Sequence, residues 1–521
     1  MRFRIERQDG FARIGELNGI KTPHLIDLRD KEDVEFFRKI AERKPPAVAE
    51  KIFPSSLDFL KKEGIVRKIT LKGANPREFV EMLLSRRDFK VPLYIPLIAS
   101  PQNLSMLIYA GADIADNAYT LSKAHEGVFL TEIGEFRLDE LRDVPCHCPA
   151  CSGREEYRSE YEYLADHNTF ALIRELLLSI KMLRSERLRD LVELRVKSNP
   201  ELTAIMRIID SKTESSAFFP RFRKSKLFPT SEDFPNRPEI QYYFQRLPEV
   251  YDPTSHICLL IPCSARKPYL ISKTHRILRS RLGRAIRGVN EIIISSPFIS
   301  PRELELIYPA SLYDTPTTGM WSEWEIDFVS SRLAPLIDRF ERIYAHLHGG
   351  YRKVAEKAGE KAGADIEFVD DVGELKRKLE SEERSDFDLY HEMFRHMMRY
   401  QFGLEFGIER VKGKYPSLEF FRKERVARID ARYGNLDVYG ELAVHLKERG
   451  VFCVEIDEFD VRGTIFSVGV RKADRNIRPN DVAVYFNSGI VGVGKALMPG
   501  KLMGEVDGRA IESRRKVISL S

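Results

Sequence analysis

Long apolar runs are absent from this sequence. No segment approaches the roughly 20 consecutive apolar residues that a membrane span requires. The sequence begins MRFRIERQDGFARIG, which is charged and contains none of the apolar core of a signal peptide. We therefore expect no signal peptide and no membrane association, and we expect the protein to be cytoplasmic.

Neither sign of charge dominates the composition. The 521 residues carry a formal net charge of +5, with 84 Lys and Arg against 79 Asp and Glu. This balance permits an RNA partner but does not require one, because the placement of charges matters more than their sum. The chain is too long for one hydrophobic core, so we expect about three or four domains.

Cysteine is scarce, and half of it lies in one place. Three of the six cysteines are Cys146, Cys148 and Cys151, and His167 follows at the start of an expected helix. Three thiolates and one imidazole form the closed S₃N shell that is typical of structural zinc. His147 is a weaker candidate, because adjacent residues seldom reach one ion. We predict a structural Zn²⁺ site; three free thiols in a loop are the alternative.

The pattern of apolar runs divides the chain into four parts. Strands and amphipathic helices alternate at the amino end, which favours a parallel sheet or barrel. A cleaner alternation follows and predicts a doubly wound parallel sheet. After a smaller mixed part, short strands separated by Gly, Asn and Asp predict a small β-barrel. We expect a multidomain α/β and α+β protein with domains at 1–245, 246–380, 381–448 and 449–521.

One stretch, ICLLIPCSARKPYLISKTH at 257–275, joins a buried strand to a dense group of reactive side chains. Pro262 ends the predicted strand, so Cys263 lies at its carboxyl end, where open α/β sheets bind ligands. Ser272 is a good N-cap for the helix that follows. Arg266 and Lys267 would favour the thiolate form of Cys263. A catalytic thiol and a buried structural cysteine both remain open.

A second group of functional side chains follows the next predicted strand of this sheet. The long segment after it is rich in Pro, Tyr and acids and holds both Trp residues of the chain. Loops of such length are usually functional or disordered, although each side chain could also be scaffold. The candidate catalytic residues are Cys263, Lys267, His275, Glu303 and Asp314, and the candidate substrate-binding residues are Ser264, Tyr269, Ser272, Tyr308, Thr318, Trp321 and Glu325.

Basic residues stud the last part of the chain, where few acids accompany them. Lysine and arginine on a small β-barrel predict a surface that binds phosphates. The candidate RNA-binding residues are Arg471, Lys472, Lys495, Lys501, Arg514 and Arg515.

The amino-terminal half resembles the tRNA-guanine transglycosylases. The resemblance rests on GADIADNAYTLSKAHEGVFLTEIGEFRLDELRDVPCHCPACSG and the later LADHN. It implies a truncated TIM-barrel-like region and zinc bound by Cys146, Cys148, Cys151 and His167. It also places Asp116 at the position of the family's nucleophile, but the Asp-Ser-Gly base-recognition motif has no counterpart in residues 1–100. Related transglycosylases dimerise through the zinc region, so a homodimer is a further expectation.

Two other stretches resemble tRNA-modifying proteins. Residues 450–521 resemble a PUA domain, an RNA-binding module. PCSARKPYLISKTH matches the Pro-Cys-Ser-x-x-Lys-Pro-Tyr-x-x-Ser-x-x-His signature of archaeosine synthases of the alpha type. This resemblance implies that free lysine is added to the nitrile of 7-cyano-7-deazaguanine (preQ0) in the D-loop of tRNA. It also implies a radical-SAM partner, an archaeosine lyase subunit, that cleaves the adduct.

Two chemical routes are compatible with these residues. In the first, the amine of lysine attacks the nitrile after Glu303, Asp314 or Glu325 accepts its proton, and His275 or Lys267 protonates the nitrile nitrogen. In the second, the Cys263 thiolate adds first and the amine then displaces it. Three alternatives remain: glutamine as the nitrogen donor, base exchange through Asp116, and a tRNA-binding protein without catalysis.

Overall fold

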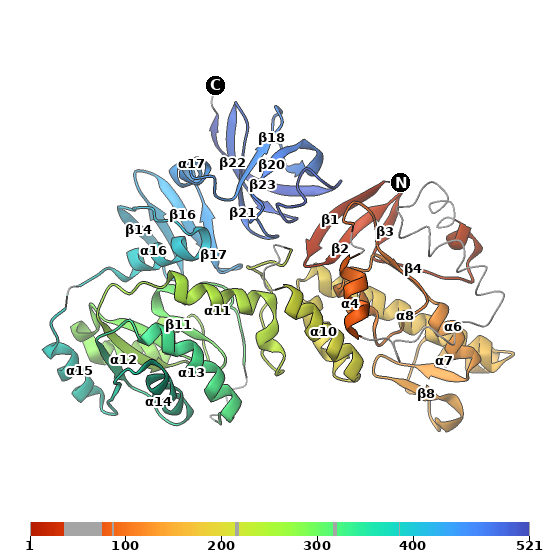
Figure 1. Ribbon diagram of the computed structural model, residues 1–521, viewed down its shortest axis with the longest axis horizontal. Helices are drawn as coiled ribbons and strands as arrows, with labels where there is room; N and C mark the ends of the chain where they lie inside the picture. The colour runs from red at the N-terminus through yellow and green to blue at the C-terminus, as the bar shows by residue number, and fades with distance from the viewer. Residues whose placement is uncertain are drawn as a thin grey trace. The chain divides into compact units, whose positions relative to one another are not determined.

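The computed structural model describes residues 2–35, 76–85, 88–213, 218–315, 320–384 and 386–519 (Figure 1). These residues form two compact units. No helix in the described ranges is long and apolar enough to cross a membrane. The first unit comprises Met1–Pro220, Val454–Asn487 and Gly494–Arg514, and the second comprises Arg221–Cys453, Ser488–Val493 and Arg515–Ser521.

The first unit begins with two small sheets. The antiparallel sheet has the order β1-β2-β3, and the parallel sheet has the order β4-β6-β5. The alternation of strands and helices expected at the amino end therefore does form a parallel sheet, which has three strands among the described residues. The strands are β1 (Phe3–Asp9), β2 (Ala12–Leu17), β3 (Ile20–Thr22), β4 (His24–Ile26), β5 (Tyr94–Ile95) and β6 (Ile114–Asp116).

Helices pack around these sheets through one apolar core. The core joins side chains of the parallel sheet to those of α5, α8, α9 and α10. The longest helix among the described residues, α8, begins where the Ser159 hydroxyl accepts a hydrogen bond from the Glu162 amide, a typical N-cap. The helices are α4 (Pro76–Ser85), α5 (Leu104–Tyr109), α6 (Ala118–His125), α7 (Pro149–Ser152), α8 (Glu160–Arg184), α9 (Leu188–Val196) and α10 (Pro200–Thr213).

The second unit contains the predicted doubly wound sheet. Its strand order is β11-β10-β9-β12-β13, and all of its strands are parallel except β11. The chain leaves β9 towards β10 on one side and then crosses to β12 on the other. The strands are β9 (Ile257–Pro262), β10 (Asn290–Ile294), β11 (Ile299–Pro301), β12 (Arg342–Ala345) and β13 (Glu367–Phe368).

Helices cover both faces of this sheet because right-handed crossovers in opposite directions lie on opposite faces. Alternate residues of β9, Ile257, Leu259 and Ile261, pack with side chains of α12 and α15. α13 and α14 pack against each other outside that cluster. The helices are α11 (Pro238–Val250), α12 (Lys273–Leu282), α13 (Glu323–Ile337), α14 (Gly350–Ala362) and α15 (Val372–Ser381).

The rest of the second unit is an α+β part. An antiparallel meander, β14-β15-β16-β17, packs with the helix α16. Gln401 on α16 fixes this packing, since its amide group donates to the Leu436 carbonyl and accepts from the Leu436 amide. The elements are α16 (Leu389–Phe402), β14 (Arg410–Lys414), β15 (Ser417–Phe421), β16 (Arg425–Asp430), β17 (Asn435–Val438) and α17 (Gly440–Glu448).

The carboxyl-terminal strands form one six-stranded sheet. Its order is β19-β23-β22-β21-β18-β20, with antiparallel pairs β18–β20 and β19–β23. The predominance of short strands agrees with the sequence prediction for this part. The strands are β18 (Cys453–Ile456), β19 (Thr464–Phe466), β20 (Val470–Ala473), β21 (Val482–Phe486), β22 (Ile490–Ala496) and β23 (Arg509–Ser519).

Candidate functional site

A cavity of about 430 Å³ opens at the carboxyl edge of the doubly wound sheet. Its wall includes Cys263, which follows β9, and Ser295 and Ser296, which follow β10. Tyr351, in the first turn of α14, completes this part of the wall. Since β9 is the strand at which the chain reverses its direction of winding, the cavity lies at the topological switch point, where open α/β sheets bind their ligands.

Cys263 is held in this cavity by a tyrosine. Its Sγ atom lies 3.2 Å from the Tyr351 hydroxyl, and the Tyr351 ring meets the Trp321 ring edge to face, with 5.0 Å between the centroids. Gly350 makes this approach possible, because a Cβ atom there would lie 2.1 Å from the Trp321 ring. The thiol therefore has an O–H donor beside it and an aromatic wall next to that donor.

Lys267 lies over a pair of buried tyrosines. Its Nζ atom is 3.6 Å from the centroid of the Tyr313 ring, and the Tyr269 and Tyr313 hydroxyls are 2.6 Å apart. Burial lowers the pKa of Lys267 to about 8, and the nearby Cys263 partly opposes this effect. An ammonium group with a pKa this close to neutrality can both donate and accept a proton during turnover.

Glu325 is the predicted carboxylate that reaches the cavity wall. It accepts hydrogen bonds from the Ser296 hydroxyl at 2.6 Å and from the Ser322 amide at 2.9 Å. Burial acts to raise the pKa of Glu325, but these hydrogen bonds outweigh it and bring the pKa below its usual value. The cavity therefore carries a negative charge near neutral pH.

His275 is part of a buried ionic network. Its Nε2 atom donates to the Pro262 carbonyl at 2.9 Å, and Nδ1 accepts from Arg302 at 2.8 Å. Burial, followed by the charge of Arg302, lowers the pKa of His275 to about 4. Arg302 also pairs with the buried Glu291 and Glu305. Both ring nitrogens of His275 are thus engaged, so this histidine holds the end of β9 against α12.

Two further catalytic candidates lie away from the cavity wall. Glu303 is buried, accepts a hydrogen bond from the Asn290 side chain and has its pKa raised by burial to about 7. Asp314 is exposed and pairs with Lys226 at 3.0 Å. Neither carboxylate lines the cavity that contains Cys263.

The substrate-binding candidates divide between cavity and scaffold. Trp321 lines the cavity, together with Glu325. Ser272 is the N-cap of α12, as predicted, and the Ser264 hydroxyl donates to the Arg266 carbonyl within the same loop. Tyr308 is buried against Gly434, whose carbonyl accepts from its amide. Thr318 lies outside the described residues.

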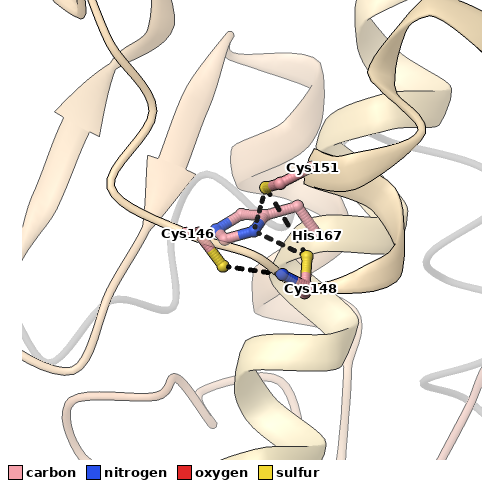
Figure 2. Close-up of side chains that lie close together, drawn as sticks. All are labelled: Cys146, Cys148, Cys151 and His167. Atoms are coloured by element: carbon pink, nitrogen blue, oxygen red, sulfur yellow. Dashed lines mark hydrogen bonds between the residues drawn. The ribbon is translucent and has the colours of Figure 1, made fainter.

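The structure brings the four predicted metal ligands together in the first unit (Figure 2). One donor atom from each of Cys146, Cys148, Cys151 and His167 lies within 4.8 Å of the others. His167 Nδ1 faces the sulfurs of Cys148 and Cys151 at 3.5 and 3.3 Å, while Nε2 donates to the Leu130 carbonyl at 3.0 Å. That second hydrogen bond fixes the tautomer that presents a lone pair to a metal.

Asp116 lies fully buried at the end of β6. Its carboxylate accepts from the Tyr94 hydroxyl and from the amides of Leu97 and Ala118. Burial raises the pKa of Asp116. A carboxylate enclosed by three donors and removed from solvent is not placed to attack a nucleoside in this conformation.

The basic residues of the carboxyl-terminal sheet are only partly available to phosphates. Arg515 is drawn into the second unit, where it pairs with Asp437 at 2.8 Å and covers the Tyr439 ring. Arg471 pairs with Asp457 at 2.7 Å, and Lys495 lies 3.8 Å from Glu512. Of the other candidates, Lys472 is an exposed residue of β20, Arg514 lies on β23, and Lys501 is exposed.

Tyr351 and Ser296 line the cavity, although the sequence did not single them out. The folded sheet brings Tyr351 to Cys263, which is 88 positions away in the sequence. It likewise brings Ser296 to Glu325, which is 29 positions away. The available signal was positional: both follow the carboxyl end of a predicted strand. Such positions face the crevice of an open α/β sheet.

The comparisons with known proteins agree with this organisation. A family model described as a domain of unknown function matches residues 240–381, and a pre-PUA domain model matches residues 387–447. The archaeosine synthase subunit alpha of Methanosarcina acetivorans is 34% identical, over 87% of this chain and 80% of that protein. The archaeosine synthase of Haloferax volcanii is 32% identical over 98% of both chains.

Transglycosylases are more distant relatives. The tRNA-guanine(15) transglycosylase of Methanobrevibacter smithii is 23% identical over 49% of this chain and 40% of its own length. The Haloferax volcanii archaeosine synthase, by contrast, exceeds 30% identity over nearly the full length of both chains. The chain therefore belongs to the archaeosine synthase family.

Proposed function

We propose that this protein modifies tRNA in archaeosine biosynthesis by adding free lysine to the nitrile of preQ0 in the D-loop. The observation that carries the proposal is the contact of 3.2 Å between Cys263 Sγ and the Tyr351 hydroxyl at the switch point of the sheet. A thiol beside an O–H donor is suited to attack on a nitrile, because the carbon needs a nucleophile while the nitrogen needs a proton.

The covalent route uses Cys263 from the cavity wall and Lys267 from the loop that follows it. Neutral Lys267 takes the Cys263 proton, and the thiolate forms a C–S bond with the nitrile carbon while Lys267 returns the proton to the nitrile nitrogen. The product is a thioimidate. The neutral amine of the donor lysine then attacks the same carbon, and the C–S bond breaks as the thiolate leaves and regains a proton. The net result is an amidine that contains all atoms of both reactants.

Glu325 supports the choice of an amine donor. Its carboxylate is negative near neutral pH and lines the same cavity as Cys263. A donor lysine carries two ammonium groups, and one of them can pair with Glu325 while the other loses its proton and reacts. Trp321 and Tyr351 provide flat surfaces on which a deazaguanine ring can stack.

We also propose that Cys146, Cys148, Cys151 and His167 hold zinc. Three sulfurs and one imidazole nitrogen match the ligand preference of this ion. A shell of four protein ligands leaves no open coordination position, so zinc here would supply rigidity to the first unit, not a Lewis acid. The surrounding residues orient the ligands; Tyr163, for example, lies 3.4 Å from Cys151 Sγ.

Two labelled reactions test the proposed activity. The protein is incubated with preQ0-bearing tRNA and labelled lysine, and separately with guanine-bearing tRNA and labelled free preQ0. We expect label in the tRNA only in the first reaction. Incorporation only of the free base would mean base exchange, and binding of tRNA without either incorporation would mean a non-catalytic protein. The first reaction is repeated with labelled glutamine in place of lysine, to test glutamine as the nitrogen donor.

Substitution of Lys267 by arginine should remove one inflection from the dependence of turnover on pH. Because burial places the Lys267 pKa at about 8, the neutral form that accepts a proton increases as pH rises through that value, and turnover should increase with it. Arginine keeps the charge but does not release its proton, so we expect a loss of about 100-fold and no inflection near pH 8. Turnover rates of the parent protein and the variant at saturating lysine, between pH 6.5 and 9, check this. The titration of the lysine substrate affects both proteins equally, so a difference between the two profiles comes from residue 267. An unchanged inflection in the variant would assign it to another group.

Substitution of Tyr351 by phenylalanine should destabilise the thiolate form of Cys263 while the aromatic ring keeps its place in the cavity wall. We expect turnover to fall about tenfold, because one hydrogen bond to a charged atom is lost. Alkylation of Cys263 at a fixed pH near 7 should also slow, which a purely structural change would not cause. Tyr344→Phe is the matched control, because it removes a hydroxyl that hydrogen-bonds to Glu382. Equal alkylation rates in both variants would exclude a role for Tyr351 in activating the thiol.

A further inference from the structure

The segment around α12 contains no acidic residue. Neither Asp nor Glu occurs between Pro253 and Asn290, although the chain has 79 acids among 521 residues. Within this segment, α12 and the following η6 (Gly283–Ile286) carry most of the basic residues. They are Lys273, Arg276, Arg279, Arg281, Arg284 and, just beyond η6, Arg287.

Four of these cations face solvent without an acidic partner. Lys273, Arg276, Arg281 and Arg284 are exposed and form no ion pair within the part of the chain that the structure describes. The other two are neutralised: Arg279 pairs with the buried Glu291, and Arg287 lies 3.8 Å from Asp386. We refer to the four unpaired residues as the α12 basic surface.

This arrangement is unfavourable for an isolated helix. Lys273 stands in the first turn of α12, where the helix dipole disfavours a cation. Arg276 lies three residues from both Lys273 and Arg279, and like charges at this spacing repel each other. Apolar contacts of Leu278 and Leu282 with the sheet hold the helix in place. Local rules broken in this way are commonly found where a surface serves a function.

A groove lies beside the α12 basic surface. It has a volume of about 780 Å³, and its lining includes Arg276, Arg279 and Arg287 as well as Asp386, which lies 3.8 Å from Arg287. Tyr390 and Tyr415, whose rings stack with 6.1 Å between centroids, also line the groove. Asp388 in the same groove is the N-cap of α16 and accepts from two backbone amides, so much of its charge is already engaged. Of the three arginines only Arg276 is unpaired among the described residues, and an unpaired arginine in a groove with aromatic rings suits a nucleotide, whose phosphate and base need these two contacts.

We propose that the α12 basic surface and its groove bind the phosphate backbone of tRNA. The inference rests on the proposed function, which makes tRNA the substrate, and adds a contact surface outside the carboxyl-terminal sheet. The helix also starts directly after the reactive loop: Ser272 caps α12, and Cys263 to Tyr269 precede it. Phosphates held on α12 would anchor the tRNA next to the strand that carries the thiol.

The test measures affinity for an unmodified tRNA transcript in the absence of lysine, at several salt concentrations. In the full-length protein, Arg276→Gln, Arg281→Gln and Arg284→Gln are combined. We expect affinity about 30-fold weaker near 0.1 M salt, and a salt dependence whose slope is smaller by about two to three units, one for each lost phosphate contact. The same three positions changed to lysine should keep most of the affinity, since charge is retained.

A control variant separates position from net charge. Lys357→Gln, Lys361→Gln and Arg377→Gln remove the same number of charges from α14 and α15, and we expect affinity within about twofold of the parent protein. Equal losses in both variants, or none in the α12 variant, would overturn the proposal. Normal tRNA affinity with loss of an acidic protein partner would do the same and reassign the surface. Because binding is measured without lysine, loss of binding in the α12 variant upholds the surface even if lysine transfer fails in the parent.

Discussion

Replacement of Cys263 by serine is expected to lower the rate of lysine addition by a factor on the order of 10³ or more. Under the covalent route the sulfur must form and then release a bond to the nitrile carbon, and a serine hydroxyl is a poor nucleophile near neutral pH. The cavity should remain otherwise intact, because serine can still accept a hydrogen bond from Tyr351. Single-turnover rates with preQ0-bearing tRNA and labelled lysine measure the effect.

Cys453→Ser provides a matched control. This thiol is also partly buried, and it donates to the backbone carbonyls of Leu446 and Val451, contacts that a serine hydroxyl can also make. Its turnover should equal that of the parent protein. If Cys263→Ser retained near-normal turnover, the amine would attack the nitrile directly, and Cys263 would only line the cavity.

Loss of one metal ligand is the second large effect that we expect. Cys148→Ser should remove the bound zinc and destabilise the first unit by several kcal/mol, since metal binding contributes about 10–16 kcal/mol in small zinc domains. The buried His167 imidazole would also lose one of the two sulfurs that face its Nδ1 atom. Zinc content per chain and thermal unfolding, each with and without a chelator, measure the two effects.

The neighbouring histidine distinguishes a specific site from general metal binding. His147 is exposed and does not belong to the four-residue cluster, so His147→Ala should keep both zinc and stability. A Cys148→Ser variant that bound zinc normally and unfolded like the parent would contradict the site. Equal zinc loss in both variants would point to loose binding by the loop.

Local features of the reactive stretch were predictable from the sequence. The apolar run ends at Pro262 and the helix begins after Ser272, and both boundaries occur in the structure. Proline and an N-capping serine act on their immediate neighbours, so the sequence carries this information directly. The spacing of Cys146, Cys148 and Cys151 is informative for the same reason, because ligands so close along the chain can share one ion.

The residues that share the cavity could not be predicted in the same way. Tyr351 meets Cys263 because β12 pairs with β9, and that pairing depends on the whole sheet. No local pattern in the sequence indicated that Arg302 donates to one ring nitrogen of His275. A buried ion network forms among residues of several elements. Which of the catalytic candidates become part of that network depends on how these elements pack.

The nucleoside formed in the reaction tests the central claim most directly. The protein is incubated with preQ0-bearing tRNA and lysine labelled uniformly with ¹³C and ¹⁵N, and the tRNA is then digested to nucleosides for mass spectrometry. We predict a modified nucleoside that has gained every labelled atom of lysine and has retained its nitrile-derived carbon and nitrogen. A nucleoside that gained only one nitrogen, or an unchanged preQ0 nucleoside, would contradict the proposed addition.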